Sequence, residues 1–347
     1  MLYVTTRSNR DPQTTHKALS ADRGPDGGLY IPFKMPVLSG EELAALKEQT
    51  FGQNVAQILE LFFSCRLSGF DVDFCIGRNL LQFASVNQRI LVAQLWHNLD
   101  NCFDRSIREL SERICDSLGC PVKQTSWLTL GIRIAVVVGV VAQLQRDGQL
   151  QEGEYVDISV PTGDFSQPMA VWYARQMGLP IGRIICSCNE NSGVWELLHL
   201  GELRTGDSVV TTTTPLADAV VPQELERLIH ATLGMEEAAR FAEKAAAGRI
   251  YRPGEDEFGK LNAGLFSAVV SRSRLDALIP SVQRTGGYIL GPYTALAYGG
   301  LMDYRAKTGE NRLSLLLAER SPVCDAAVVT QSMRVSLPQL KAALEKA

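Results

Sequence analysis

The sequence lacks a long hydrophobic run, a block of basic residues and a signal-like N-terminus. Its longest apolar stretch, residues 134–142, has nine residues, whereas a membrane-spanning helix needs roughly 20, so we expect no membrane partner. The formal net charge is −4, and without a basic patch nucleic acid is not an expected partner. No basic segment followed by an apolar one opens the chain, which predicts a cytoplasmic protein.

Closely spaced cysteine pairs are also missing. The eight cysteines are scattered without a Cys-x-x-Cys pair, and the four histidines show no ligand spacing with them. This pattern argues against the common structural zinc sites. In a chain without an export signal we expect reduced thiols, most of them buried as small apolar side chains.

Several segments have the end signals or the periodicity of helices. Ser39 is a candidate N-cap, with Glu42 as its capping-box partner. Residues 51–63 and 105–118 place apolar side chains at helical spacing. Residues 132–144 are predicted to form a helix, although their β-branched content leaves a strand open. The chain length is enough for two domains, or for one large α/β domain with an appendage.

The centre of the chain alternates between strand and helix patterns. Residues 154–165 read as a buried strand that enters a polar loop, a helix ended by Gly178 follows, and residues 182–189 read as the next strand. This order is typical of a βαβ unit and therefore predicts a parallel sheet. The residues expected to be buried in the two strands are Val156, Ile158, Val160, Ile184 and Ile185.

Four segments, distributed along the chain, together resemble one enzyme family. They are residues 3–32, which contain YVTTRS and GPDGGLYIP; residues 159–191, which contain VPTGDFS, YARQMGLP and SCNEN; residues 214–229, TPLADAVVPQELERLI; and residues 287–299, GYILGPYTALAYG. In this order they are similar to segments of threonine synthase, which belongs to the pyridoxal-phosphate fold type II proteins.

The resemblance implies a fold, a cofactor and a reaction. The fold would be α/β with a mainly parallel sheet. Residues 1–90 would form the threonine synthase-like N-terminal region, which we expect to be helical, and residues 91–347 the α/β domain. The family converts O-phosphohomoserine to threonine and phosphate with pyridoxal phosphate (PLP). Its chemistry needs a lysine that forms a Schiff base, a loop for the PLP phosphate and a small mobile domain that closes over the substrate.

The lysine segment is altered at its central position. Residues 95–105, LWHNLDNCFDR, align without a gap with the family pattern Leu-Trp/Phe-His-Gly-Pro-Thr-x-Ala-Phe-Lys-Asp. Asp104 stands where the lysine is expected, and a carboxylate cannot form a Schiff base. The resemblance therefore leaves no catalytic residue, and we predict that PLP is not bound covalently; Lys123 would be the first lysine to examine. Alternatively, Asp104 is a surface or N-cap residue before a helix that begins near Ser106.

The segment that resembles the phosphate loop is also changed. It consists of Thr162, Gly163, Asp164, Phe165 and Ser166. Asp164 replaces an asparagine of the family, and Ser166 replaces a glycine. Backbone N–H groups could still form an anion nest here, but a carboxylate repels phosphate. We therefore expect weak noncovalent binding of a phosphate, and an ordinary polar turn remains the alternative.

Two further differences affect the rest of the implied site. Residues 291–293 lack the aspartate and histidine of the family, and Glu319 and Arg320 would crowd the ring nitrogen of PLP. From Asp104 to Ser159 there are 159 − 104 = 55 residues, which is too few for the small mobile domain that the family has here. We expect that domain to be largely missing.

These losses lead to three functional hypotheses. The first is a threonine synthase-like pseudoenzyme with impaired catalysis. The second is a non-catalytic protein that binds a small phosphorylated or amino-acid ligand, or that pairs with a homologous threonine synthase. The third is an enzyme with a new site that uses His97 or a cysteine, although no arrangement of nucleophile and base supports it.

Overall fold

A central six-stranded sheet organises the fold, which a computed structural model describes for residues 1–77, 81–96 and 98–345. The strands of this sheet are β4 (Gln82–Asn87), β5 (Ile90–Gln94), β6 (Val156–Pro161), β7 (Ile181–Cys188), β10 (Leu265–Val269) and β11 (Ser314–Ala318). Their order is β10-β7-β6-β11-β5-β4, and all neighbours pair in parallel except β4 and β5. The mostly parallel sheet confirms the predicted α/β class.

The predicted strand–helix–strand unit is present in the middle of the sheet. α7 (Ser166–Gln176) connects β6 to β7, and these strands pair with Ile158 opposite Ile184 and Val160 opposite Cys186. Strands of parallel sheets are covered on both faces and therefore carry apolar residues on both. The residues predicted to be buried here are all buried: Val156, Ile158, Val160, Ile184 and Ile185.

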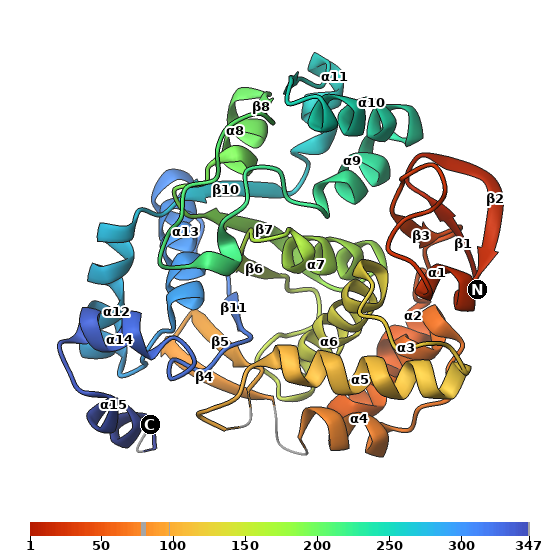
Figure 1. Ribbon diagram of the computed structural model, residues 1–347. Coiled ribbons are helices and arrows are strands. Elements are labelled where there is room, and N and C mark those ends of the chain that lie inside the picture. Colours follow the sequence, from red (N-terminus) through yellow and green to blue (C-terminus); the bar gives the residue numbers. More distant parts are fainter. Residues whose placement is uncertain (78–80, 97, 346–347) are drawn as a thin grey trace.

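Helices cover both faces of the sheet (Figure 1). α6 (Ser126–Arg146) and α7 pack on one face, whereas α12 (Arg272–Gly286) and α13 (Pro292–Thr308) pack on the other. Each face therefore has its own apolar core. The remaining helices and short strands are α1 (Thr15–Leu19), α2 (Gly40–Glu48), α3 (Phe51–Phe63), α4 (Gly69–Ile76), α5 (Phe103–Leu118), α8 (Gly193–Leu200), β8 (Leu203–Arg204), η1 (Pro215–Ala217), α9 (Leu225–Leu233), α10 (Met235–Ala246), β9 (Ile250–Tyr251), α11 (Glu255–Leu261), α14 (Ala326–Met333) and α15 (Leu337–Leu344).

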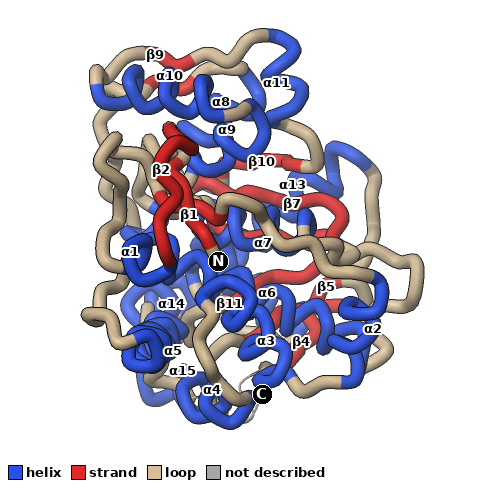
Figure 2. The backbone as a smooth tube through the Cα atoms, turned by 90° about the vertical axis from the view of Figure 1, so that its right-hand side faces the viewer, coloured by secondary structure: helices blue, strands red, loops and turns tan. Residues whose placement is uncertain are grey.

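The N-terminal region begins with a small sheet, not with helices. β1 (Leu2–Thr5), β2 (Ser8–Thr14) and β3 (Tyr30–Pro32) pair antiparallel in the order β2-β1-β3. They lie to one side of the central sheet in Figure 1, and Figure 2 shows β1 and β2 from that side. The expectation of a helical region was wrong here, because local periodicity does not reveal which distant segments pair. The central sheet itself begins at Gln82, before residue 91, since β4 pairs with β5.

The helix signals read from the sequence correspond to helices in the structure. The hydroxyl of Ser39 accepts a hydrogen bond from the backbone N–H of Glu42 (3.2 Å), and the Glu42 carboxylate accepts one from the Ser39 N–H (2.7 Å), which completes the predicted capping box of α2. Residues 51–63 form α3, and residues 105–118 lie within α5. The helix alternative for residues 132–144 is confirmed, since they lie within α6.

α6 is the central helix of the core. By length and composition it could cross a membrane, but 83% of its most apolar window is buried inside the protein. Gly131 and Gly139 allow α3 to approach closely, since a Cβ at these positions would lie 2.5 Å from the ring of Phe63 and 2.9 Å from the ring of Phe51. The apolar character of α6 is therefore explained by helix–helix packing within the fold.

The interval between α5 and β6 contains no additional domain. Residues 104–155 are all described, and they contain most of α5, the whole of α6 and no strand. α6 packs against α3 and α7, so it is part of the large domain. This interval therefore contains no separate α/β domain, which agrees with its short length.

A buried arginine connects the N-terminal region to the rest of the protein. The side chain of Arg227, at the start of α9, is 0% exposed and pairs with Glu224. Its guanidinium also donates to the backbone carbonyl of Tyr30 (2.9 and 3.1 Å) and to the hydroxyl of Ser126 (3.1 Å), and it lies over the ring of Trp127. One side chain thus joins β3, α6 and α9.

Candidate functional site

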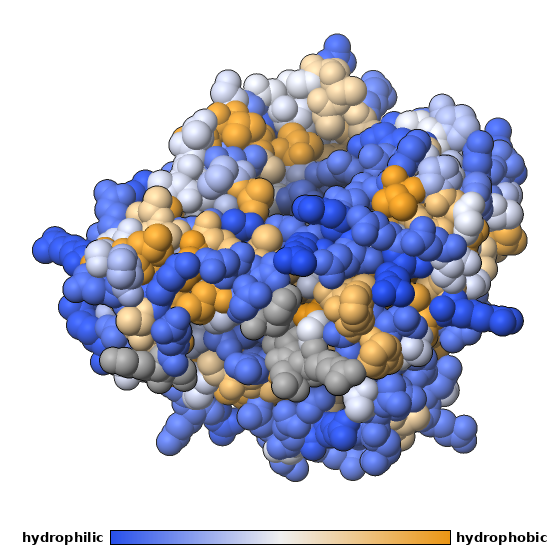
Figure 3. All heavy atoms as spheres, turned by 60° about the horizontal axis from the view of Figure 1, so that its bottom comes forward, coloured by the Kyte–Doolittle hydropathy of each residue, from blue (hydrophilic) through white to orange (hydrophobic). Residues whose placement is uncertain are grey.

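A cavity opens at the carboxyl ends of β6 and β11, where open parallel sheets commonly bind their ligands. Its volume is about 420 Å³, and its walls come from the first turns of α5 and α13, from α6, and from the segments after β6 and β11. Asp104 lies in it together with Thr162, Gly163, Asp164 and Ser166. The fold therefore brings the altered lysine position and the altered loop together, whereas Phe165 is buried in the core. A space-filling view shows one face of the molecule hollowed near its centre, with mainly hydrophilic residues around the hollow (Figure 3).

Asp104 lies in the first turn of α5 and is not its N-cap. The N-cap residue is Cys102, and α5 begins at Phe103, three residues before the predicted start at Ser106. The backbone N–H of Phe103 donates to the carbonyl of Glu319 (2.7 Å), which fixes the start of the helix against the end of β11. Of the alternative reading, the N-cap role was therefore wrong, whereas the surface position is confirmed, since the side chain of Asp104 is 49% exposed. A carboxylate in the first turn is favourable for the helix dipole, but the side chain of Asp104 also faces the cavity.

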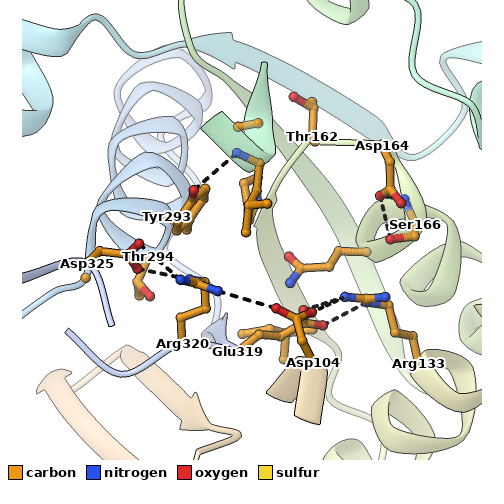
Figure 4. A pocket seen from close by; sticks show the side chains of 17 residues that line it. Asp104, Arg133, Thr162, Asp164, Ser166, Tyr293, Thr294, Glu319, Arg320 and Asp325 are labelled. Atoms are coloured by element: carbon orange, nitrogen blue, oxygen red, sulfur yellow. Dashed lines mark hydrogen bonds and ion pairs between the residues drawn. The ribbon is translucent and has the colours of Figure 1, made fainter. Parts of the chain in front are cut away.

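Five charged side chains form a continuous chain along the cavity wall (Figure 4). Asp104 lies between Arg133 (3.8 Å) and Arg320 (3.4 Å). Arg133 makes two hydrogen bonds to Glu319 (3.0 and 2.8 Å), and Arg320 makes two to Asp325 (3.0 and 3.2 Å). The order is Asp325, Arg320, Asp104, Arg133, Glu319, and we call it the ion-pair chain. Asp104, which the sequence resemblance aligns with the family's lysine, therefore lies between two arginines, each of which is bound more closely to another carboxylate.

The electrostatic environment keeps both arginines of the ion-pair chain charged. Burial alone would lower the pKa of Arg133, but Glu319, Asp164 and Asp104 together raise it above its ordinary value. The same holds for Arg320, where Asp325 is the main partner that raises the pKa. Sequence reasoning missed Arg133. The sequence nevertheless contains a clue to its role, because Arg133 is a charged residue inside an apolar helix. A charged side chain in such a place is rarely buried without a partner.

The loop after β6 has backbone angles suited to an anion nest, but the carboxylate of Asp164, a residue of the same loop, already accepts a hydrogen bond from the N–H of Ser166. Gly163 and Phe165 have positive φ angles of 48° and 71°, and the loop leads into the N-terminus of α7, where backbone N–H groups attract anions. The carboxylate of Asp164 accepts hydrogen bonds from the N–H (2.9 Å) and the hydroxyl (2.6 Å) of Ser166. An incoming phosphate would therefore have to displace a carboxylate of the same chain.

Asp164→Asn should increase the affinity of the cavity for inorganic phosphate. The asparagine oxygen can still accept from Ser166, while the negative charge beside the loop is removed. For a partly exposed site we expect an effect of roughly 1 kcal/mol, or about fivefold. Isothermal titration calorimetry with inorganic phosphate measures this, with Asp11→Asn on the exposed β2 as the matched control. Equal phosphate affinity in wild type and Asp164→Asn would contradict the role assigned to this carboxylate.

Tyr293 closes another side of the cavity, in the segment where the family has a histidine. Its hydroxyl accepts a hydrogen bond from the backbone N–H of Leu216 (3.2 Å), and the guanidinium of Arg320 lies over its ring at 5.7 Å from the ring centre. Burial raises the pKa of the Tyr293 hydroxyl. Tyr293 is therefore a neutral wall residue that holds the η1 segment against α13.

The hypothesis of a new catalytic site on His97 or a cysteine gains no support. His97 lies outside the described residues. Six of the eight cysteines are buried, as predicted, and burial raises the pKa of Cys65 to about 12 and of Cys75 to about 11. Such thiols are poor nucleophiles.

Comparisons with known proteins give consistent results along the chain. A family model described as threonine synthase N terminus matches residues 2–78. The human protein "Threonine synthase-like 1" is 26% identical over 175 residues, which are 50% of this chain and 24% of that protein. The threonine synthase of Corynebacterium glutamicum is 33% identical over 148 residues, 40% of this chain and 31% of that protein. The matches thus span less than a third of these curated relatives.

Solved structures show the fold over nearly the whole chain. The PLP-bound threonine synthase of Brucella melitensis superposes with a TM-score of 0.83 at 18% identity, covering 96% of this chain and 92% of that chain. Yeast threonine synthase gives a TM-score of 0.81 at 16% identity, covering 96% and 90%. The chain therefore has the PLP fold type II. Over parts of its length the chain is also similar in sequence to threonine synthases and threonine synthase-like proteins.

The residues of the cavity do not fit PLP as the family binds it. No lysine lines the cavity in the described part of the chain, and Lys123 instead donates to the backbone of Ser20. The phosphate nest is filled by Asp164. Glu319 is paired with Arg133, and Arg320 is paired with Asp325. Both lie in the part of the cavity wall that the sequence resemblance places near the ring nitrogen of PLP.

Proposed function

We propose that this threonine synthase-like protein does not convert O-phosphohomoserine to threonine, and that its cavity binds a small ligand noncovalently. The observation that carries the proposal is the position of Asp104, held between Arg133 and Arg320 where the family's lysine would be. A carboxylate cannot form a Schiff base with PLP, and the neighbouring Arg133 and Arg320 are each paired with another carboxylate of the protein.

Two further observations support the proposal. The family's small domain closes over the substrate and excludes water, which such chemistry needs, and the interval 104–155 contains only helices of the large domain. The cavity itself is retained, with a volume of about 420 Å³, within the usual size range of small-molecule sites. Loss of the catalytic parts together with retention of the cavity favours a binding protein over an enzyme.

Asp104→Lys should not restore turnover. A lysine at this position supplies the amine, but it places a third positive charge beside Arg133 and Arg320, while Asp164 still fills the phosphate nest and no domain closes over the substrate. We expect phosphate release from O-phosphohomoserine in the presence of PLP to stay at the level of the matched variant Asp104→Asn. Wild-type protein treated with PLP and borohydride should show no stoichiometric lysine label by mass spectrometry.

Either of two results would overturn the proposal. One is robust phosphate release by wild type or by Asp104→Lys, which would show that the missing domain is dispensable. The other is stoichiometric labelling of a single lysine in the wild type, with Lys123 the first candidate.

A further inference from the structure

We propose that the cavity binds a short aliphatic molecule with protonated amino groups, and not a phosphorylated one. This inference rests on the proposed function in one respect, because it takes the cavity as a noncovalent ligand site. It adds the chemical class of the ligand, which neither the fold nor the relatives assign.

The balance of charges in the cavity favours a cation. Four acidic residues and two basic ones line it, which gives a formal charge of +2 − 4 = −2. The acidic residues are Asp104, Asp164, Glu319 and Asp325, and the basic ones are Arg133 and Arg320. An anion would meet this negative surplus in a partly enclosed space, where charge interactions are stronger than in water.

The arginines are not available to an incoming anion. Each one makes two hydrogen bonds to a carboxylate and also contacts Asp104. Two of the carboxylates, Asp104 and Asp164, take part in weaker ion pairs or in none. The side chain of Asp104 is 49% exposed and its contacts are the longest in the chain, and Asp164 has no ion-pair partner in the part of the chain that the structure describes. Two carboxylates therefore remain for a cationic ligand.

One neutral side chain in the wall points to a hydrogen-bonding ligand independently of the charges. Thr294 is only 4% exposed and lines the cavity, and its hydroxyl forms no hydrogen bond with the described residues. Buried polar groups normally have partners, and an ammonium group supplies three N–H donors.

The remaining wall suits a short alkyl chain. Leu216, Ala217 and Leu317 line the cavity beside the ring of Tyr293, and Leu216 is 58% exposed although it is apolar. A ligand that covers Leu216 removes apolar surface from water, which is favourable. A diamine with a short methylene spacer offers an apolar middle for this wall and one ammonium group for each of the two carboxylates, Asp104 and Asp164.

The test compares three probes by calorimetry on the full chain: 1,4-diaminobutane, the uncharged 1,4-butanediol and inorganic phosphate. We expect the diamine to bind at least tenfold more tightly than the diol or phosphate, and to bind more weakly as sodium chloride is added. Asp104→Asn and Asp164→Asn should each weaken diamine binding about tenfold, whereas Asp11→Asn should leave it unchanged. Asp104→Asn should fold, because both arginines retain their bidentate partners.

Tighter binding of phosphate than of the diamine would overturn the inference, as would diamine binding that neither cavity variant weakens. Absence of any diamine binding would also overturn it, but would leave the proposed function standing, since that rests on lysine labelling and phosphate release. Conversely, turnover of O-phosphohomoserine would refute the proposed function whatever the diamine does.

Discussion

Replacing Arg227 with methionine should lower the free energy of unfolding by about 3–5 kcal/mol, because removing one partner of a buried ion pair leaves the other charge unpaired. The carboxylate of Glu224 would be left in the core, and the carbonyl of Tyr30 and the hydroxyl of Ser126 would lose a donor. Chemical denaturation measures the change. An effect below about 1 kcal/mol, the range of exposed pairs, would show that the region around Arg227 relaxes or admits water.

The loss in Arg227→Met should depend on pH. Burial raises the pKa of Glu224 in the folded protein, and Arg227 opposes that rise; without the arginine the pKa should rise further. A raised folded-state pKa stabilises the fold below the unfolded-state pKa of about 4.3, and this stabilisation is lost as the pH rises through the folded-state value. The variant should therefore be more destabilised relative to wild type at pH 8 than at pH 5.

The chain contains a matched control for this experiment. Arg240 is also three residues after its partner, Glu237, and lies over the ring of Tyr251, but its side chain is 39% exposed. Arg240 is much more exposed than Arg227, and Glu237 keeps a hydrogen bond from the hydroxyl of Tyr251 (2.6 Å), so Arg240→Met should cost only about 1 kcal/mol. Equal effects of the two substitutions would indicate that burial of Arg227 is not the cause.

Arg133→Met should have the second-largest effect, about 3 kcal/mol. Methionine suits the apolar helix α6, so helix formation itself is preserved. The cost arises because Glu319, whose side chain is only 12% exposed, loses its bidentate partner and faces Asp104 across a short distance. Denaturant titration of the variant and of wild type gives the difference.

A double variant distinguishes the ion pair from simple packing. Arg133→Met combined with Glu319→Gln leaves no uncompensated charge, so it should recover much of the stability lost in Arg133→Met alone. We expect a coupling energy of about 1.5–3 kcal/mol in this double-mutant cycle. Strict additivity of the two single substitutions would mean that the pair contributes nothing specific, and the ion-pair chain would not be a unit.

The sequence predicted those parts of the fold that local patterns determine. Residues 156–161 and 181–188 are short strands rich in valine and isoleucine on either side of a helix of ordinary length, so the βαβ unit could be read directly. The pairing of β1 with β3 could not, because β2 and α1 lie between them in the chain and periodicity does not reveal such a contact. The start of α5 was placed at Ser106 instead of Phe103, since the hydrogen bond that fixes it comes from Glu319, more than 200 residues away.

The candidate site was only partly predictable for the same reason. Asp104 and the loop from Thr162 to Ser166 stood out because they replace residues in recognisable segments. Arg133 and Asp325 were not singled out from the sequence, and only the fold brings them next to Asp104 and Arg320. The sequence also gave no sign that Asp164 hydrogen-bonds to Ser166, because this contact depends on the backbone angles of the loop.

The two-helix connection between Asp104 and β6 has a kinetic consequence. α6 packs against α3 and α7, so this connection offers no separate body that could swing across the cavity mouth. For the ligand that we propose, entry and exit should therefore need no movement of this connection, and we expect its residence time to depend on its contacts in the cavity.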